Sequence, residues 1–287
     1  MISLWQALAL GAVQGITELF PVSSLGHSVL LPGLLGWHVN QNANDFLTFL
    51  VATHFATALT LFCIYWKDWV RIIRGIFRSL AEREIRDADA RLGWLLVVTT
   101  IPAGIAGVLF ETAVQRIFIA PAAAALFLIL NGALLFGAER LRRRARRNLA
   151  ADADIRDADR RIATELSWGA SLKIGVLQII ALIPGFSRTG ATLAGSLLAG
   201  LSHEDALRYS FLLATPIIGA AALLKLPPLV ASGDRATIEV ALVGAAAAAI
   251  TAYFSAKFLA QYFKTKTLTP FAVYCAALGL LGLIFLR

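Results

Sequence analysis

Apolar side chains occur in long unbroken runs along this 287-residue chain. Residues 46–66, 92–110, 117–138 and 267–286 contain no Asp, Glu, Lys or Arg. About 20 helical residues, each rising about 1.5 Å, cross a hydrocarbon core about 30 Å thick. The pattern predicts an all-α integral membrane protein. Full spans are expected near 46–66, 93–111, 120–138, 206–225, 237–261 and 267–286.

Two further apolar regions, 3–37 and 168–200, are each interrupted in the middle. The interruptions read Phe20-Pro21-Val22-Ser23-Ser24-Leu25-Gly26-His27 and Ile183-Pro184-Gly185-Phe186-Ser187-Arg188-Thr189-Gly190. Proline lacks a backbone donor and disfavours helix in the residue before it. Each region is therefore predicted to form a re-entrant hairpin, with a helix, a non-helical tip and a second short helix.

The two halves of the chain resemble each other. Gln14 and Gln178 precede the two prolines, and Ser24 and Ser187 each stand three residues after a proline. The segment 50–53 is echoed by 212–215, at an offset of about 162 residues. These correspondences indicate a tandem duplication.

Composition and charge exclude an ordinary soluble domain. Only 15% of the residues are charged and 58% are hydrophobic, against roughly 25% charged in a soluble protein. Of the 26 Lys and Arg residues, 16 lie in the stretches 67–91 and 139–161, a pattern that sets membrane orientation. The net charge of +8 is therefore interpreted as topology and not as a nucleic-acid surface. The interleaved residues Asp152, Asp154, Asp157 and Asp159 disfavour the alternative that 139–161 is a nucleic-acid-binding arm.

Placing both basic stretches in the cytoplasm fixes the expected topology. The hairpin at 3–37 then enters from outside and the hairpin at 168–200 enters from the cytoplasm, so the two halves are inverted. The prediction is a single membrane domain over 1–287, with repeat one at about 1–138, a basic cytoplasmic loop at 139–165 and repeat two at about 166–287. Each repeat is a re-entrant hairpin plus three spans. Paired broken segments in inverted repeats point to a binding site near the bilayer midplane.

Ionisable groups inside membrane segments are costly and suggest function. Glu18 follows Gln14 by one turn, so both side chains share a helix face. Ser23 and Ser24 stand where the second short helix begins, a position at which free backbone N–H groups bind anions. His27 is expected to project near both serines. Glu18, the two serines and His27 are predicted to converge on one helix N-terminus.

The second tip places Ser187 at the equivalent cap, followed at once by Arg188. The planar guanidinium group suits bidentate phosphate binding, so the two tips together predict a site for a phosphate group. Simpler roles remain open: Ser23 and Ser24 as caps only, and Glu18 as an ion-pair partner of Arg188. His54 is interpreted as a packing or hydrogen-bonding residue behind the site. Further residues interpreted as structural are Lys173, Cys63 and Cys275.

The motifs from Gln14 to Glu18 and from Pro21 to His27 resemble the first signature of the undecaprenyl-diphosphate phosphatases of the bacitracin-resistance type. The segment from Pro184 to Gly190 resembles the second signature, and the resemblance extends over the whole chain. It implies an inner-membrane enzyme that hydrolyses undecaprenyl diphosphate to undecaprenyl phosphate and inorganic phosphate. It also implies access from the periplasmic side and a dependence on magnesium or calcium. The expected partners are undecaprenyl diphosphate, membrane lipids and a second copy in a homodimer, with no nucleic acid.

The resemblance also assigns residues. Gln14 and Glu18 fit the family's motif of Glu or Gln followed by Glu, and Ser24, His27 and Arg188 fall on positions regarded as essential. Leu25 stands where Thr is frequent and Thr189 where Ser is usual. The catalytic set is thus Glu18, Ser24, His27 and Arg188, with Glu18 also as a metal ligand. The substrate-binding set is Gln14, Ser23, Gly26, Ser187, Thr189 and Gly190.

The mechanism expected from these residues is in-line attack on the terminal phosphorus. Ser24 is the favoured nucleophile, activated by His27 or Glu18, with Arg188 stabilising the transferring oxygens. Two alternatives stay open, namely His27 as a nucleophile that forms a phosphohistidine and Glu18 as the group that activates water. A competing function is a transporter that moves a polyprenyl phosphate or another anion without hydrolysis, since inverted repeats are typical of transporters.

Overall fold

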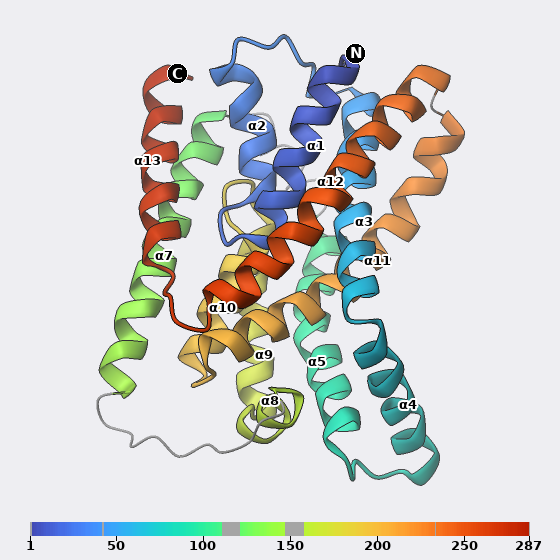
Figure 1. Ribbon diagram of the computed structural model, residues 1–287, viewed down its shortest axis with the longest axis vertical. Coiled ribbons are helices and arrows are strands. Elements are labelled where there is room, and N and C mark those ends of the chain that lie inside the picture. The colour runs from blue at the N-terminus through green and yellow to red at the C-terminus, as the bar shows by residue number, and fades with distance from the viewer. Residues whose placement is uncertain (1, 42, 111–120, 147–157, 233, 287) are drawn as a thin grey trace.

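The computed structural model describes residues 2–41, 43–110, 121–146, 158–232 and 234–286. All regular secondary structure within these ranges is helical (Figure 1). The prediction of an all-α protein is therefore confirmed for the part of the chain that is described.

Six apolar helices correspond to the six predicted spans. Five of them are long and apolar enough to cross a membrane, and the sixth, α13, is apolar but has only 17 residues. The chain is therefore a multi-pass membrane protein. Residues 111 and 120, where two predicted spans were expected to end and begin, lie outside the described ranges. The six helices are α3 (Asn44–Ile64), α5 (Ala88–Leu109), α7 (Pro121–Arg146), α11 (His203–Ser232), α12 (Arg235–Tyr262) and α13 (Thr269–Phe285).

Both interrupted regions are broken as predicted. The first is α1 (Leu4–Leu19) followed by α2 (Ser24–Leu34). The second is α9 (Trp168–Gln178), a 3₁₀ turn (Ile179–Leu182) and α10 (Arg188–Leu198). Figure 1 shows α1 entering from the end that holds both termini and α2 returning to that end, whereas α9 starts near α8 at the opposite end. This arrangement fits the predicted inverted repeat, which stays a prediction.

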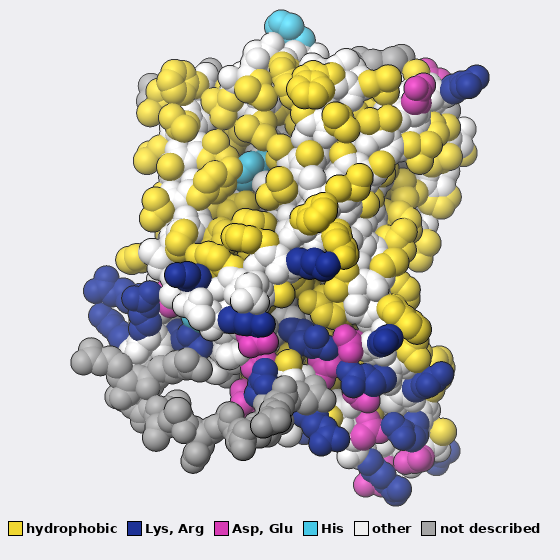
Figure 2. Space-filling view, viewed as in Figure 1, with side chains coloured by type: hydrophobic (Ala, Val, Ile, Leu, Met, Phe, Trp, Pro, Cys, Tyr) yellow, Lys and Arg dark blue, Asp and Glu magenta, His cyan; other side chains and the backbone are white. Residues whose placement is uncertain are grey.

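The basic stretches gather at one end of the molecule (Figure 2). They contain more helix than the sequence analysis expected. Helix α4 (Trp66–Glu82) occupies most of the first stretch. In the stretch expected as a loop at 139–165, α7 continues to Arg146 and α8 covers Ala158–Glu165. The residues between them, including Asp152, Asp154 and Asp157, lie outside the described ranges.

Ion pairs hold the helices of the basic end together. Asp159 of α8 is buried and accepts hydrogen bonds from Arg208 Nε of α11 at 2.6 Å and from Arg71 Nη2 of α4 at 2.9 Å. Arg161 of α8 pairs with Asp205 of α11 at 2.7 Å. Buried charges are tolerated when they are paired and hydrogen-bonded. Helix α8 is therefore docked on the helical bundle by its charged side chains.

Small residues let α1 lie directly against α12. A Cβ atom added at Gly11 or Gly15 would collide with the backbone of Gly244 or Ala248. Thr251 Oγ1 on α12 also donates a hydrogen bond to the backbone O of Ala12 at 3.0 Å. Small residues that allow backbones to approach are typical of helix contacts in membranes. This contact fixes α1, and with it the tip that follows.

Candidate active site

The two hairpin tips meet inside the helical bundle. Ser23 of the first tip has a positive φ of 65°, and its Oγ accepts the N–H groups of Gly26 at 3.1 Å and of Gly185 at 3.2 Å. Gly185 belongs to the second tip. Ser187 Oγ caps α10 by accepting the Gly190 N–H at 3.0 Å. Both predicted caps are present, and one of them also joins the two tips.

Asn131 of α7 holds both tips from behind. Its Nδ2 donates to the backbone O of Pro21 at 2.9 Å, and its Oδ1 accepts the N–H of Ser187 at 3.1 Å. The side chain is fully buried. Asn131 was not among the residues expected at the site, because it lies in an uninterrupted apolar span. The sequence did hold one signal for a buried polar role, since Asn131 is the only Asn or Gln residue between 120 and 138.

Replacing Asn131 with leucine is expected to destabilise the folded protein by about 1–3 kcal/mol, because a buried donor and a buried acceptor lose their partner. Thermal unfolding in detergent measures this. Thr100→Val is a suitable control, since Thr100 Oγ1 donates only to Leu96 O of its own helix. If Asn131→Leu unfolds at the same temperature as the parent, the hydrogen bonds from Asn131 to the two tips do not stabilise the fold.

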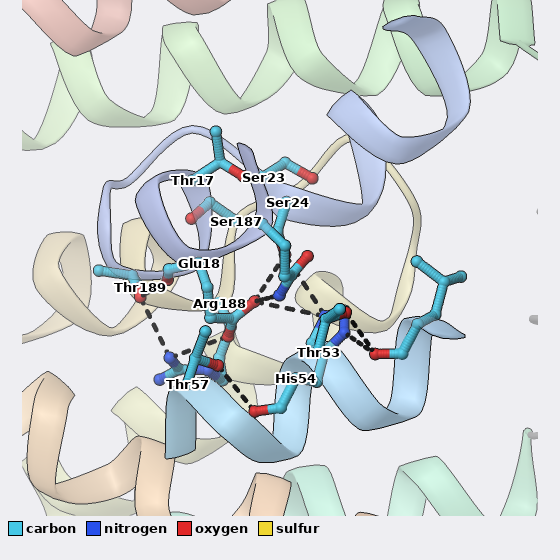
Figure 3. A network of polar contacts seen from close by, with 12 residues as sticks. Thr17, Glu18, Ser23, Ser24, Thr53, His54, Thr57, Ser187, Arg188 and Thr189 are labelled. Atoms are coloured by element: carbon cyan, nitrogen blue, oxygen red, sulfur yellow. Dashed lines mark hydrogen bonds and ion pairs between the residues drawn. The ribbon is translucent and has the colours of Figure 1, made fainter. Parts of the chain in front are cut away.

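Glu18 is the centre of the polar network between the tips (Figure 3). Its side chain is only 7% exposed. Ser24 Oγ donates to Glu18 Oε2 at 2.5 Å, and Gln14 Nε2 donates to the same oxygen at 3.2 Å. Arg188 Nη2 donates to Oε1 at 3.2 Å. The predicted meeting of Glu18 and Ser24 is therefore observed, as is the common helix face of Gln14 and Glu18.

Arg188 joins the second tip to the first. Besides its ion pair with Glu18, its guanidinium donates to the backbone O of Ser210 at 3.3 Å and to Thr189 Oγ1 at 3.2 Å. Thr189 Oγ1 in turn donates to the backbone O of Glu18 at 2.8 Å. The interpretation of Glu18 as an ion-pair partner of Arg188 is thus confirmed, and it is compatible with a role in binding anions.

His54 of α3 faces the same network. Its Nε2 lies 3.4 Å from Glu18 Oε2 and 3.5 Å from Ser24 Oγ. Its Nδ1 donates to the backbone O of Leu50 at 2.8 Å, so Nε2 is the nitrogen that points toward the site. His54 was expected to pack or hydrogen-bond behind the site. Its hydrogen bonding is observed, but its ring lines the cavity and does not lie behind the network. Helical spacing along α3 does not reveal which helix α3 packs against.

His27 points to a different neighbour than expected. Its Nδ1 donates to the backbone O of Ser23 at 2.7 Å, and its Nε2 accepts from Tyr274 Oη at 2.7 Å. The two rings are stacked, with centroids 5.6 Å apart. His27 is near Ser23, as predicted, but both of its nitrogens already have partners. The structure does not bring it to the Ser24 hydroxyl, and its contacts orient the first tip.

The two glycines assigned to substrate binding have another role in the structure. The N–H groups of Gly26 and Gly190 already donate to the capping oxygens of Ser23 and Ser187. A Cβ atom at Gly26 would lie 3.2 Å from Gly185 Cα. Both N–H groups are thus engaged in the caps and both glycines allow the close approach of the tips, while their assignment to substrate binding stays a prediction.

A cavity of about 320 Å³ opens beside the network. Its polar lining includes His54, Arg188 and Gln178. Most of the remaining lining is aliphatic, from α3, α5, the 3₁₀ turn and α11. The lining residues of α3 lie in its first half and those of α11 in its second half, toward the end of the molecule that holds both termini (Figure 1). The arrangement suits an anionic head with an apolar tail.

Comparison with known proteins identifies the family. The model of the family described as "Bacitracin resistance protein BacA" matches residues 7–281. The chain belongs to the BacA family. It is 46% identical to a protein named undecaprenyl-diphosphatase from Mycolicibacterium paratuberculosis, over 98% of this chain and 96% of the relative. It is 41% identical to an undecaprenyl-diphosphatase from Acidiphilium cryptum, over 98% of this chain and 97% of the relative.

The resemblance to the BacA family also implies a divalent cation. The side chains of this site can therefore be compared with the oxygen ligands that such an ion requires. Calcium takes six to eight oxygen ligands, and magnesium prefers octahedral coordination by oxygen. Within the described residues no group of three or more His, Cys, Asp or Glu side chains could hold a metal. Both Glu18 oxygens accept hydrogen bonds, and one faces Arg188. The described residues of this BacA family member therefore provide no cluster of three such ligands, and the divalent cation stays a prediction.

Proposed function

We propose that this protein hydrolyses undecaprenyl diphosphate to undecaprenyl phosphate and inorganic phosphate in the bacterial inner membrane. The observation that carries the proposal is the hydrogen bond of 2.5 Å from Ser24 Oγ to Glu18 Oε2. It joins a nucleophile to a base beside the guanidinium of Arg188. A binding site alone would need donors and positive charge but no such pair. The names of the relatives support the same activity.

In the first step Ser24 Oγ attacks the terminal phosphorus of the diphosphate. Glu18 accepts the hydroxyl proton, because its carboxylate already receives that hydrogen bond. The bond from phosphorus to the bridging oxygen breaks, and its electron pair leaves with undecaprenyl phosphate. A hydroxyl group is a weak nucleophile without an adjacent base, so the contact with Glu18 is required. The product on the protein is phosphorylated Ser24.

Arg188 exchanges partners during this step. In the structure its guanidinium is paired with Glu18 Oε1. An incoming diphosphate offers more negative charge and a geometry that matches the planar fork. Transfer of the guanidinium to phosphate oxygens stabilises the charge of the transition state and leaves Glu18 a better proton acceptor. One residue thus couples substrate binding to activation of the nucleophile.

In the second step water attacks the phosphorus of phosphorylated Ser24. Glu18 transfers the proton that it holds to the Ser24 oxygen as that oxygen leaves, and inorganic phosphate is released. His54 Nε2 lies 3.4 Å from Glu18 and accepts a proton from the attacking water, which it gives up to solvent as inorganic phosphate leaves. The sum of both steps is the consumption of one water molecule for each diphosphate cleaved.

The site is reached from the periplasmic side in this proposal. The support is the position of the cavity, whose lining belongs to the halves of α3 and α11 that lie away from the basic end. Basic segments are retained in the cytoplasm. All the reacting groups come from one chain, so a homodimer is not needed for the chemistry. A magnesium or calcium ion would enter with the diphosphate oxygens, and no step above depends on it.

The test is phosphate release from undecaprenyl diphosphate by the purified protein in detergent. The proposal expects stoichiometric undecaprenyl phosphate and inorganic phosphate. A parallel assay follows movement of a labelled polyprenyl phosphate across vesicle membranes. Movement of the lipid with no phosphate release would contradict the enzyme and favour the transporter.

A further inference from the structure

Gln178 is a buried amide for which the proposed mechanism has no role. It is the last residue of α9, directly before the 3₁₀ turn of the second hairpin. The residue is 2% exposed, and it lines the cavity together with His54 and Arg188. Among the described residues, neither its Nε2 nor its Oε1 has a hydrogen-bond partner. An amide with two unpartnered atoms thus lies at a cavity near the proposed reaction centre.

Such burial is unfavourable and calls for an explanation. A buried amide without partners destabilises a folded protein, and native proteins satisfy nearly all such groups. The described groups around the cavity offer Gln178 no such partner. Most other residues that line this cavity are aliphatic, including Ala181 and Leu182 of the adjacent turn. A leucine at position 178 would be the better choice if only stability mattered.

The first hairpin contains a corresponding amide, Gln14, whose surroundings differ from those of Gln178. Gln14 precedes its proline as Gln178 does, but Glu18 follows one turn later and accepts the Gln14 Nε2 hydrogen bond. At the equivalent place after Gln178 the chain has Leu182. The second amide therefore has no carboxylate of its own, and its donor is left for a group that enters the cavity.

We propose that Gln178 binds the diphosphate head of the substrate, with its Nε2–H donating to a phosphate oxygen while Arg188 holds the same head. This inference rests on the proposed function for the identity of the ligand. A neutral amide suits the position, because an unpaired cation in an apolar cavity would cost far more than an unpaired amide. Binding of the head supplies the hydrogen-bond partner that the described side chains do not give Gln178.

The variant Gln178→Leu tests the inference with two measurements. Steady-state phosphate release from undecaprenyl diphosphate gives KM and kcat. Equilibrium binding of undecaprenyl methylenediphosphonate, whose CH₂ bridge cannot be hydrolysed, gives Kd. Loss of a hydrogen bond to a charged group predicts that KM and Kd both rise about tenfold or more. The melting temperature should stay equal to that of the parent or rise.

Two further variants separate binding from a structural role. Gln178→Glu keeps the size and polarity but places a carboxylate near the phosphate, so Kd should rise further than in Gln178→Leu. Ser196→Ala removes another buried polar atom without a partner, on α10 and outside the cavity lining. Its KM and Kd should equal those of the parent.

The outcomes are distinct. Parent-like Kd and KM in Gln178→Leu would overturn the role of Gln178, and so would a lower melting temperature with unchanged Kd. Absence of phosphate release by the parent would instead refute the proposed function. The binding comparison with the diphosphonate would still decide whether Gln178 contacts the head.

Discussion

Replacing Ser24 with alanine is expected to reduce the rate of phosphate release by roughly 10³-fold or more, as removal of a nucleophile does in other hydrolases. The physical reason is that, within the described parts of the chain, Ser24 supplies the hydroxyl that donates to the Glu18 carboxylate, at 2.5 Å. The measurement is kcat for undecaprenyl diphosphate. Binding of the diphosphonate should change little, because the Ser24 hydroxyl acts on the reacting phosphorus and does not anchor the head.

Ser23→Ala is the matched comparison for Ser24→Ala. Ser23 Oγ accepts two backbone N–H groups, one from each tip, so its loss should lower the melting temperature and leave measurable turnover. Helix caps of this kind contribute about 1 kcal/mol. The sequence could not decide which of the two serines is only a cap. Near-parental turnover in Ser24→Ala, with loss of turnover in Ser23→Ala, would reverse the assignment.

Arg188→Lys is expected to lower kcat/KM by about 10²–10³-fold, although it keeps the positive charge. A lysine cannot contact the Glu18 carboxylate, the Ser210 carbonyl and a phosphate oxygen with one planar group. Its ammonium should stay paired with Glu18, so the carboxylate remains a poor base. Phosphate release across a range of substrate concentrations measures the effect.

Arg208→Lys provides the same chemical change at a partly buried site away from the cavity. Arg208 pairs with Asp159 and Asp68 at the basic end of the molecule. This variant should be less stable than the parent, with kcat/KM of the folded fraction unchanged. Equal losses of kcat/KM in both variants would argue against a specific role for Arg188 in phosphate transfer.

The breaks and spans could be predicted from the sequence because their causes are local. Pro21 and Pro184 each stand in a short segment with Ser or Gly neighbours, and this combination favours a helix end. By contrast, Pro32 and Pro102 lie inside continuous helices. The spacing of Gln14 and Glu18 fixes their common helix face, and Ser187 immediately before α10 marks a cap. The predicted meeting of Glu18 and Arg188 needed one further step, the duplication of the hairpin, and the observed ion pair agrees with it.

The parts that sequence reasoning missed depend on tertiary packing. The spacing from Ser24 to His27 gives the direction of the imidazole around α2, but Tyr274, which binds it, comes from α13. His54 reaches Ser24 only because α3 packs beside the first hairpin. Asn131 acts through its position behind both tips. These contacts join residues far apart in the sequence, so no local sequence pattern predicts them.

Rapid acid quenching of the protein with undecaprenyl diphosphate labelled in its terminal phosphate tests the central claim most directly. The account predicts acid-stable label on the peptide that contains Ser24, no such label in Ser24→Ala, and loss of the label as inorganic phosphate appears. Acid-labile label on His27, or full turnover without label on Ser24, would contradict it.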